Sequence, residues 1–222
     1  TGLAAPVLPF EEGYPDWGGT NWTQPTDPRR WMKHSVVWYS QQITAALGAD
    51  RIERDLKAFG YGNAGFGGDP GRNNGLERAW ISSSLKIAPV EQVAFLRNLV
   101  NRTLPVAPGA IDRTMALVQG VAAGDGWVVS GKTGSAYPRM ADGRFDRARS
   151  WGWFVGWAQK GDRTLVFARL DQDAVGIVVF HGMTIAHIHV HHVVVQLAAL
   201  NHAMLNHHHH LLLMGFVHIG GA

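Results

Sequence analysis

Apolar side chains recur at helical spacing in several stretches of the first 121 residues. Residues three and four apart lie on one face of a helix, so this spacing predicts amphipathic helices. The clearest stretch is 89–102, in which Val93, Leu96 and Val100 share one face and Pro89 stands in the first turn. The same reasoning predicts helices over 40–48, 50–59 and 109–121.

The residues around these helices mark where they begin and end. Asp27 followed by Pro28 predicts a helix start, because aspartate accepts hydrogen bonds from backbone N–H groups and proline suits the first helical position. Gly48 and Gly60 predict helix ends, since glycine adopts the left-handed conformation without steric cost. Residues 11–30 are dense in Gly, Pro, Asn and Asp and predict an irregular loop.

The spacing of apolar residues changes to two after residue 126, which predicts strands. The predicted strands are 127–134, 149–158 and 163–170, and a Lys-Gly-Asp turn at 160–162 joins the last two into an antiparallel hairpin. One face of the middle strand carries Trp151, Trp153, Val155 and Trp157. Helices followed by an antiparallel sheet make an α+β domain.

Composition narrows the functional classes. The chain has 222 residues, of which 46% are hydrophobic and 17% charged, as in a globular protein. Lys and Arg number 20 against 17 Asp and Glu, and the basic residues are scattered, so we expect no nucleic-acid-binding surface. The absence of cysteine excludes disulfides and thiol chemistry. The sequence shows no signal peptide and no apolar run long enough for a membrane span.

Charge is distributed very unevenly along the chain. Every Asp, Glu, Lys and Arg lies within residues 1–173, whereas residues 174–222 have none and hold eleven of the twelve histidines. Globular domains carry charges over their whole surface. We therefore predict a boundary near Asp173, with an incomplete domain over 1–173 and an unrelated, charge-free, His-rich tail over 174–222.

The histidines of that tail are candidate metal ligands. A strand over 185–190 would place His187, His189 and His191 on one face, and imidazoles bind Zn²⁺ and similar metals. The tail has no carboxylate to orient them, and His207–His210 resembles a short tag. The prediction is therefore no specific metal site and no cofactor, with metal binding by the tail as the less favoured alternative.

A Ser-x-x-Lys sequence at Ser83 and Lys86 matches hydrolases in which the lysine deprotonates a nucleophilic serine. That chemistry needs both residues on one helix, where positions i and i+3 project together. Here the predicted helix starts only at Pro89, and the residue before a proline is driven out of helical dihedrals. We therefore predict an extended or turn segment over 81–88 and no catalytic role for this pair.

Three short motifs occur in a definite order along the chain. Ser35-Val36-Val37 precedes a predicted helix, Tyr61-Gly62-Asn63 follows the next one, and Lys132-Thr133-Gly134 ends the first strand. Together with the Trp- and Gly-rich run at 151–157, this order closely resembles the class D serine β-lactamases, the oxacillinase family, over about residues 5–173. The resemblance implies a serine β-lactamase or penicillin-binding-protein-like fold of helices and an antiparallel sheet.

The resemblance also implies roles for individual residues. Opening a β-lactam through an acyl-enzyme needs a nucleophile, a base, oxyanion donors and a cation for the substrate carboxylate. Ser35 matches the family's proton-relaying serine and Lys132 its strand lysine, and these two are the catalytic candidates. The substrate-binding candidates are Thr133 for the carboxylate, Gly134 for room beside the strand, and the Ser135 N–H as an oxyanion donor.

A further set of residues matches the wall of the family's site. Its members are Val37, Tyr61, Gly62, Asn63 and Trp80. Trp80 matches the tryptophan that steadies a carbamylated lysine in the family. The residues by themselves also allow simpler interpretations, with Trp80 as an ordinary half-buried aromatic and Ser35 as a hydroxyl at a helix start.

Two features of the family are unmatched. The nucleophilic Ser-x-x-Lys lies upstream of all these motifs in the family, and this chain begins after that point, so the predicted domain is N-terminally truncated. The family's arginine after the last core strands is also unmatched, since no arginine follows Arg169. The expected family reaction is β-lactam hydrolysis through a serine acyl-enzyme, and we expect this chain to be impaired or inactive in it.

Two alternatives stay open beside an impaired enzyme. One is a penicillin-binding sensor module, which releases a bound penicillin slowly or not at all, and the other is a catalytically inactive fragment. In each case the expected partners are β-lactams such as penicillins, with no nucleic acid and no membrane span in this chain. The resemblance implies a periplasmic or secreted location, and the sequence leaves the oligomeric state open.

Overall fold

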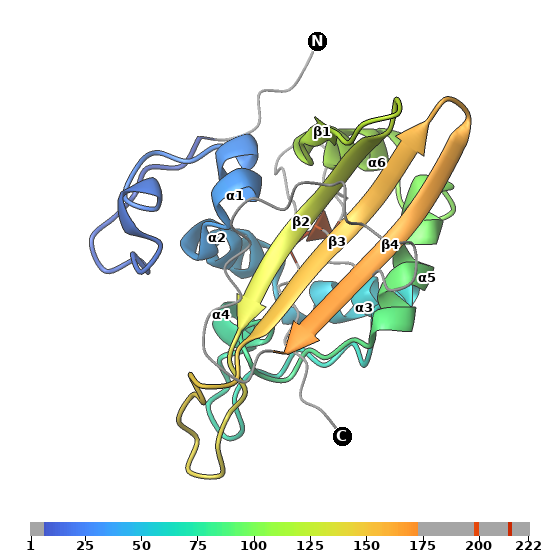
Figure 1. Cartoon of the computed structure of the whole chain (residues 1–222). Coiled ribbons are helices and arrows are strands. Elements are labelled where there is room, and N and C mark those ends of the chain that lie inside the picture. Colours follow the sequence, from blue (N-terminus) through green and yellow to red (C-terminus); the bar gives the residue numbers. More distant parts are fainter. Residues whose placement is uncertain (1–6, 173–197, 200–212, 215–222) are drawn as a thin grey trace.

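The computed structural model describes residues 7–172, 198–199 and 213–214 (Figure 1). The helical elements are the 3₁₀ turn η1 (Gly19–Asn21) and the helices α1 (Pro28–His34), α2 (Val37–Leu47), α3 (Ala49–Phe59), α4 (Gly75–Arg78), α5 (Pro89–Val100) and α6 (Pro108–Leu117). The strands are β1 (Gly120–Ala122), β2 (Val128–Ala136), β3 (Trp151–Lys160), β4 (Arg163–Gln172), β5 (Ala198–Ala199) and β6 (Leu213–Met214).

Strands β1 to β4 form one antiparallel sheet in the order β1-β2-β3-β4. Figure 1 shows the helices gathered behind this sheet, so that one of its faces is turned toward them. The pairing places Trp153, Val155 and Trp157 of β3 on a single face, and all three are buried. The predicted α+β fold and the predicted apolar face of the middle strand are both confirmed.

Two predicted helix boundaries are wrong. α2 begins at Val37 rather than at residue 40, directly after Val36 in an extended conformation. α6 ends at Leu117, because Val118 has extended dihedrals (φ −87°, ψ 109°). Residues 120 and 121, which the helical spacing had placed in the same helix, belong to the edge strand β1. Pairing with β2 outweighs the local helical pattern there, since strand formation depends on the partner strand.

The buried face of α5 also differs from the predicted one. Phe95, Leu96 and Leu99 are buried, whereas Val93 and Val100 are only half-buried. The apolar stripe of a surface helix is more than about 100° wide, so spacing alone does not show where its centre lies. The two valines border the stripe, and the larger phenylalanine and leucine side chains fill its centre.

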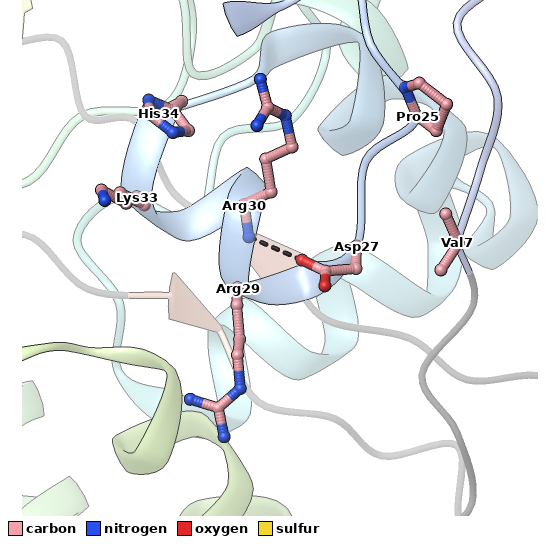
Figure 2. Close-up of a pocket in the computed structure, with 7 residues that line it drawn as sticks. All are labelled: Val7, Pro25, Asp27, Arg29, Arg30, Lys33 and His34. Carbon is pink, nitrogen blue, oxygen red and sulfur yellow. Dashed lines mark hydrogen bonds between the residues drawn. The ribbon is translucent and has the colours of Figure 1, made fainter.

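The capping residues behave mostly as predicted. Asp27 caps α1, because its Oδ1 accepts a hydrogen bond from the Arg30 N–H at 2.7 Å, and Pro28 is the first helical residue (Figure 2). Gly60 ends α3 in the left-handed conformation (φ 62°, ψ 37°). Gly48 has a positive φ of 79°, but its ψ of 152° lies outside the left-handed helical region. It is the single residue between the end of α2 and the start of α3.

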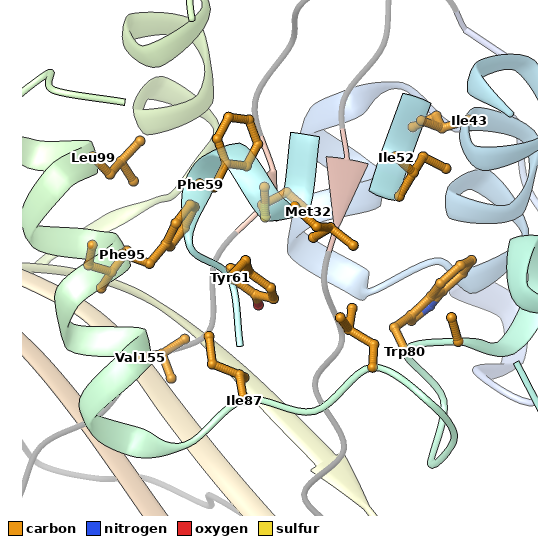
Figure 3. Close-up of a cluster of buried hydrophobic side chains, with 14 of the residues drawn as sticks. Met32, Ile43, Ile52, Phe59, Tyr61, Trp80, Ile87, Phe95, Leu99 and Val155 are labelled. Carbon is orange, nitrogen blue, oxygen red and sulfur yellow. The ribbon is translucent and has the colours of Figure 1, made fainter. Parts of the chain in front are cut away.

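One hydrophobic core lies between the helices and the sheet. Figure 3 shows part of it, including Ile43 of α2, Ile52 of α3, Leu99 of α5 and Val155 of β3. The fully buried tryptophans are Trp31, Trp38, Trp80 and Trp153. Each large apolar side chain contributes about 2–3 kcal/mol when it is removed from water. This core holds the helices that carry the first two motifs against the strand that carries the third.

The predicted boundary at Asp173 and the tail histidines His187, His189 and His191 lie outside the described residues. The division of the chain at that point therefore stays a prediction. Within the part of the chain that the structure describes, no helix is long and apolar enough to cross a membrane. In the same ranges, no group of three or more His, Asp or Glu side chains is placed to hold a metal ion.

Candidate active site

Strand β2 has an open edge over part of its length in the described structure. β3 pairs with β2 along the whole of 128–136, whereas β1 pairs only with residues 128–130. Residues 131–136 therefore lack a strand partner on one side among the described residues. Unpaired N–H and C=O groups of a strand edge bind extended ligands by backbone hydrogen bonds.

The direction of the backbone groups along this edge follows from the pairing with β3. The carbonyl oxygen of Ser130 lies toward β3, only 1.8 Å from where a Cβ on Gly156 would stand. Neighbouring residues of a strand direct their N–H and C=O groups to opposite edges. Thr133 and Ser135, which are three and five residues further on, therefore direct theirs to the open edge, and both residues are exposed.

Lys132 lies near the start of this stretch. It is buried on the helix-facing side of the sheet, opposite Val155 of β3. Its Nζ donates a hydrogen bond to the carbonyl oxygen of Thr133 at 2.8 Å. Burial lowers the pKa of Lys132 to about 8, because the charged ammonium loses hydration. An anion at the edge would stabilise the charged form, so Lys132 offers a cation to a carboxylate ligand.

Ser35 lies at the junction of α1 and α2, close to the same lysine. The pKa of the preceding residue, His34, is lowered by burial and then by the positive charges of Arg30, Lys33 and Lys132. A charge that shifts the pKa of His34 lies within electrostatic range of it. The fold thus brings Lys132 of the sheet into the neighbourhood of the helix junction that holds Ser35.

The backbone at this junction is held in an uncommon conformation. Ser35 has left-handed dihedrals (φ 54°, ψ 45°), which cost a residue with a side chain roughly 1–2 kcal/mol. Two hydrogen bonds hold it: the Ser35 N–H donates to the Trp31 carbonyl, and Trp22 Nε1 donates to the His34 carbonyl at 2.9 Å. Val37 is buried at the start of α2. Strained backbone of this kind is common at functional sites.

The second motif, Tyr61-Gly62-Asn63, forms a tight turn after α3. Tyr61 is buried, its hydroxyl accepts a hydrogen bond from Gln92 Nε2 at 3.4 Å, and burial raises its pKa. Gly62 has a positive φ of 54°, and a Cβ there would stand 2.0 Å from the carbonyl oxygen of Lys86. Only glycine fits this position, because the turn packs its backbone directly against the segment before α5.

Asn63 joins that turn to the same segment by side-chain hydrogen bonds. Its Oδ1 accepts from the N–H groups of Lys86 at 2.9 Å and Gly65 at 3.0 Å, and its Nδ2 donates to the Ser84 carbonyl at 2.9 Å. In the backbone, the Asn63 N–H donates to the Lys86 carbonyl at 2.9 Å. Asn63 therefore holds the turn after α3 against the segment before α5.

The Ser-x-x-Lys segment itself is not helical, as predicted. Leu85 and Ile87 are buried while Lys86 between them is exposed, which is the alternation of an extended chain. The Oγ of Ser83 is buried. Lys86 thus points to solvent and is not placed to deprotonate Ser83.

Trp80 lies just before this segment and is fully buried, not half-buried. Its ring stacks on Phe66, with centroids 6.0 Å apart and planes at 22°. The indole Nε1 is buried and has no hydrogen-bond partner among the described residues. An unpaired buried donor costs roughly 1–3 kcal/mol, and such groups are candidates for binding a polar ligand atom.

A separate depression of about 370 Å³ lies on α1 (Figure 2). It is lined by Val7, Pro25, Asp27, Arg29, Arg30, Lys33 and His34. Figure 2 shows Arg29 and Arg30 pointing in opposite directions. Arg29 Nη1 donates to the Ala116 carbonyl at 3.4 Å and Arg30 Nη2 to the Asn21 carbonyl at 3.0 Å. The basic groups do not converge, so this depression is not built as an anion site.

Comparison with known proteins identifies the family of this chain. The family model of the penicillin binding protein transpeptidase domain matches residues 2–176. The solved structure of the class D β-lactamase OXA-427 matches with a TM-score of 0.72 and 42% sequence identity, covering 82% of this chain and 74% of that chain. The chain belongs to the class D β-lactamase family.

Curated members of the class D family and a receptor relative match over shorter lengths. The β-lactamase OXA-9 of Klebsiella pneumoniae is 46% identical over 144 residues, which are 65% of this chain and 53% of that protein. The regulatory protein BlaR1 of Bacillus licheniformis is 27% identical over 171 residues, 75% of this chain and 26% of that protein. The chain spans about half the length of the curated β-lactamases it matches.

Membership of the class D family confirms the predicted resemblance and fold. The roles of Ser35 and Lys132 stay predictions, as do those of the other site residues. Sequence reasoning did not single out His34, which precedes Ser35. It also did not single out Arg139, three residues after the end of β2, or its ion-pair partner Asp69, which lies between α3 and α4. Asp69 and Arg139 carried no usable signal, because an aspartate in a glycine-rich loop and an arginine after a strand are both common.

Proposed function

We propose that this class D domain binds β-lactams along the open edge of β2. The observation that carries the proposal is the buried Lys132 ammonium beside residues 131–136, which lack a strand partner on one side among the described residues. A β-lactam has a carboxylate and an amide carbonyl at a fixed distance, and a cation next to a strand edge complements both. No other described strand combines an open edge with a buried cation.

Each candidate residue has a part in the proposed complex. Lys132 attracts the carboxylate and Thr133 adds a hydrogen bond to it, while Gly134 leaves room for the ligand beside the strand. The Ser135 N–H, directed to the open edge, donates to the lactam oxygen as negative charge develops there. In the family reaction Ser35 would pass a proton toward the lactam nitrogen as a nucleophile opens the amide bond, a step for which these residues supply no nucleophile. Val37, Tyr61, Gly62, Asn63 and Trp80 form the supporting wall.

The family reaction is hydrolysis through a serine acyl-enzyme, and we infer that these 222 residues are impaired or inactive in it. The one Ser-x-x-Lys of the sequence is Ser83 with Lys86, in a non-helical segment with the lysine exposed. No other residue of the sequence matches the nucleophile. Removal of a nucleophile of this kind costs about 10⁶-fold in turnover in a well-studied serine hydrolase.

Titration with benzylpenicillin, followed by protein NMR, tests binding. We expect Lys132→Met to weaken the affinity about tenfold to hundredfold, since a charge-assisted hydrogen bond contributes about 1.5–3 kcal/mol. Lys86→Met, which removes an exposed lysine, is the matched control and should leave the affinity unchanged. Equal effects of both variants, or no binding by the unmodified chain, would sink the proposal.

Intact-mass spectrometry and a chromogenic cephalosporin test the inferred loss of turnover. We expect no acyl adduct and no hydrolysis above the buffer rate. An adduct on any serine would overturn this inference, and an adduct on Ser83 would also overturn the assignment of its segment as non-catalytic. Binding and turnover are measured in separate experiments, so the proposed binding and the inferred loss of turnover can each be refuted independently.

A penicillin-sensing module is the second candidate function. The solved C-terminal domain of the Bacillus licheniformis BlaR penicillin-receptor has a TM-score of 0.63 and 26% identity, covering 76% of this chain and 61% of that chain. A sensor would give an acyl adduct that persists for hours, whereas an enzyme would release it. We propose a periplasmic or secreted location for either function, which cell fractionation tests.

A further inference from the structure

Strand β4 forms another open edge of the sheet in the described structure. It pairs only with β3 among the described residues, and Figure 1 shows it as the outermost strand of the sheet. The pairing is one to one from Arg163 to Gln172, so β4 has no bulge, and it contains no proline. A long and regular strand edge of this kind presents N–H and C=O groups with which another strand can pair.

The charges of β4 all lie on one of its faces. Directly paired residues of neighbouring strands lie on the same face of a sheet, so the pairing with β3 shows which residues of β4 face the helices. These helix-facing residues are Thr164, Val166, Ala168, Leu170 and Gln172. None of them is charged. The charged residues of β4 alternate with them on the outer face and are Arg163, Arg169 and Asp171.

The open edges of β2 and β4 differ in their protection against another strand. Edge strands of natural proteins avoid pairing with other chains by means of prolines, bulges or charged side chains that point into the protein. The open stretch of β2 has such an inward charge, the buried Lys132. The helix-facing side of β4 has no charge, and its backbone is regular. Strand addition is therefore disfavoured at β2 and unopposed at β4.

The order of the charges along β4 makes the strand complementary to itself. Two copies related by a two-fold axis run antiparallel at a shared edge, with the same faces of their sheets aligned. When the axis passes beside Phe167, Arg163 of each copy lies directly opposite Asp171 of the other, and both side chains are on the outer face. Opposite charges at directly opposed positions stabilise a pair of strands.

Neighbouring registers lack this complementarity. An axis beside Val166 would place Arg163 of each copy opposite Arg169 of the other, so that like charges face each other twice. An axis beside Ala168 would place no opposite charges directly across the interface. The charge pattern thus favours the register centred on Phe167.

Apolar side chains match in the same register. Leu165 is 44% exposed, which is unusual among the large apolar residues of the described structure. The register places it opposite Arg169 of the second copy, whose aliphatic stem can cover it. On the helix-facing side, Val166 lies opposite Ala168, so neither face of the contact opposes a charge to an apolar side chain alone.

We propose that β4 is a dimerization edge, at which β4 of a second copy of this chain pairs antiparallel about a two-fold axis beside Phe167 and joins the two sheets into one. Each copy uses its single β4 edge, so the assembly closes as a dimer. β3 separates β4 from β2, so the stretch of β2 that carries Lys132 stays open in both copies. The dimer is therefore independent of β-lactam binding, and its tests use no β-lactam.

Sedimentation equilibrium of the full chain over a range of concentrations tests the dimer. We expect Arg163→Glu to raise the dissociation constant about tenfold, because both symmetric pairs become like-charge pairs. Arg163→Glu combined with Asp171→Arg exchanges the charges and should return the constant to within about threefold of wild type. Arg113→Glu, the same reversal at an exposed arginine of α6, is the matched control and should change nothing. A wild type that stays monomeric, or an equal effect of Arg113→Glu, would overturn the proposal.

Cysteine cross-linking tests the register. The chain has no cysteine, so each variant carries only the thiol placed in it. Opposite residues of antiparallel strands have Cα atoms about 4.5–5.5 Å apart, which a disulfide can span. A mixture of Arg163→Cys and Asp171→Cys should therefore cross-link under mild oxidation. Neither variant should cross-link alone, because its thiol lies about 26 Å from that of its own second copy. No cross-link in the mixture, or equal cross-linking of one variant alone, would rule out pairing centred on Phe167.

Discussion

Gly131 of β2 lies directly opposite Gly156 of β3, and the two backbones approach too closely for a side chain on either residue. A Cβ on Gly156 would stand 1.8 Å from the Ser130 carbonyl oxygen and 2.6 Å from the Gly131 Cα. A Cβ on Gly131 would stand 2.4 Å from the Val155 carbonyl oxygen. This contact holds β2, which carries Lys132, close to β3.

Gly156→Ala should therefore destabilise the fold. The added methyl meets backbone atoms, which move only with the strands, so we expect a loss of about 1–3 kcal/mol in the free energy of unfolding by urea. Gly67→Ala is the control, because nothing lies within 4 Å of its Cβ position, and its effect should be much smaller. Equal losses of stability at the two positions would contradict the close backbone contact between β2 and β3 at Gly156.

Because Lys132 is buried, the free energy of unfolding should change with pH in the alkaline range. Its pKa falls from 10.5 to about 8 in the fold, so below pH 8 the folded state holds a poorly hydrated ammonium. That penalty is on the order of 3 kcal/mol. Between pH 8 and 10.5 the folded state loses the proton before the unfolded state does, so the penalty fades and stability rises.

A comparison with Lys132→Met isolates this effect from other titrating groups. Between pH 8 and 10.5 we expect the free energy of unfolding of the wild type to rise relative to that of Lys132→Met. Urea titrations at several pH values measure this difference. Lys86→Met, at an exposed position, serves as the reference. A difference between wild type and Lys132→Met that stays flat with pH would contradict the burial of the ammonium.

Asn63→Ala should loosen the wall of the site. It removes two hydrogen bonds accepted from Lys86 and Gly65 and one donated to Ser84, so we expect a loss of about 2 kcal/mol in the free energy of unfolding. Asn63→Asp keeps the two accepted bonds and should cost less. Thermal and urea unfolding of the pair give the comparison, and an aspartate variant no better than the alanine variant would argue against these bonds.

The ion pairs of Asp69 with Arg78 and Arg139 should weaken at acidic pH. The folded pKa of Asp69 lies below its ordinary value of 3.8, so its stabilising effect is complete above that value and is lost as the pH falls through the lower folded value. We expect Asp69→Asn to be about 1 kcal/mol less stable than wild type at pH 7. The gap should narrow near pH 3 in urea titrations, and a gap that widens there would contradict the ion pairs.

Much of the fold was predictable because it depends on neighbours in the chain. The cap at Asp27, the stop at Gly60 and the hairpin turn at 160–162 each rest on local hydrogen bonds or on the dihedral preferences of single residues. The non-helical state of the Ser83 segment followed from Pro89 in the same way. The end of α6 was not predictable, since residues 120–122 become a strand only by pairing with residues 128–130.

The sequence by itself determined which family this chain belongs to, because three motifs in order with a Trp-rich strand are specific even before any contact is known. Only the tertiary structure decided the environment of the site. The open edge of β2, the burial that lowers the pKa of Lys132, and the bond from Arg139 to Asp69 all join residues that are distant along the chain. Packing brings these groups together, and the loss of hydration in the folded state shifts their pKa values. A local sequence pattern predicts neither their proximity nor their pKa values.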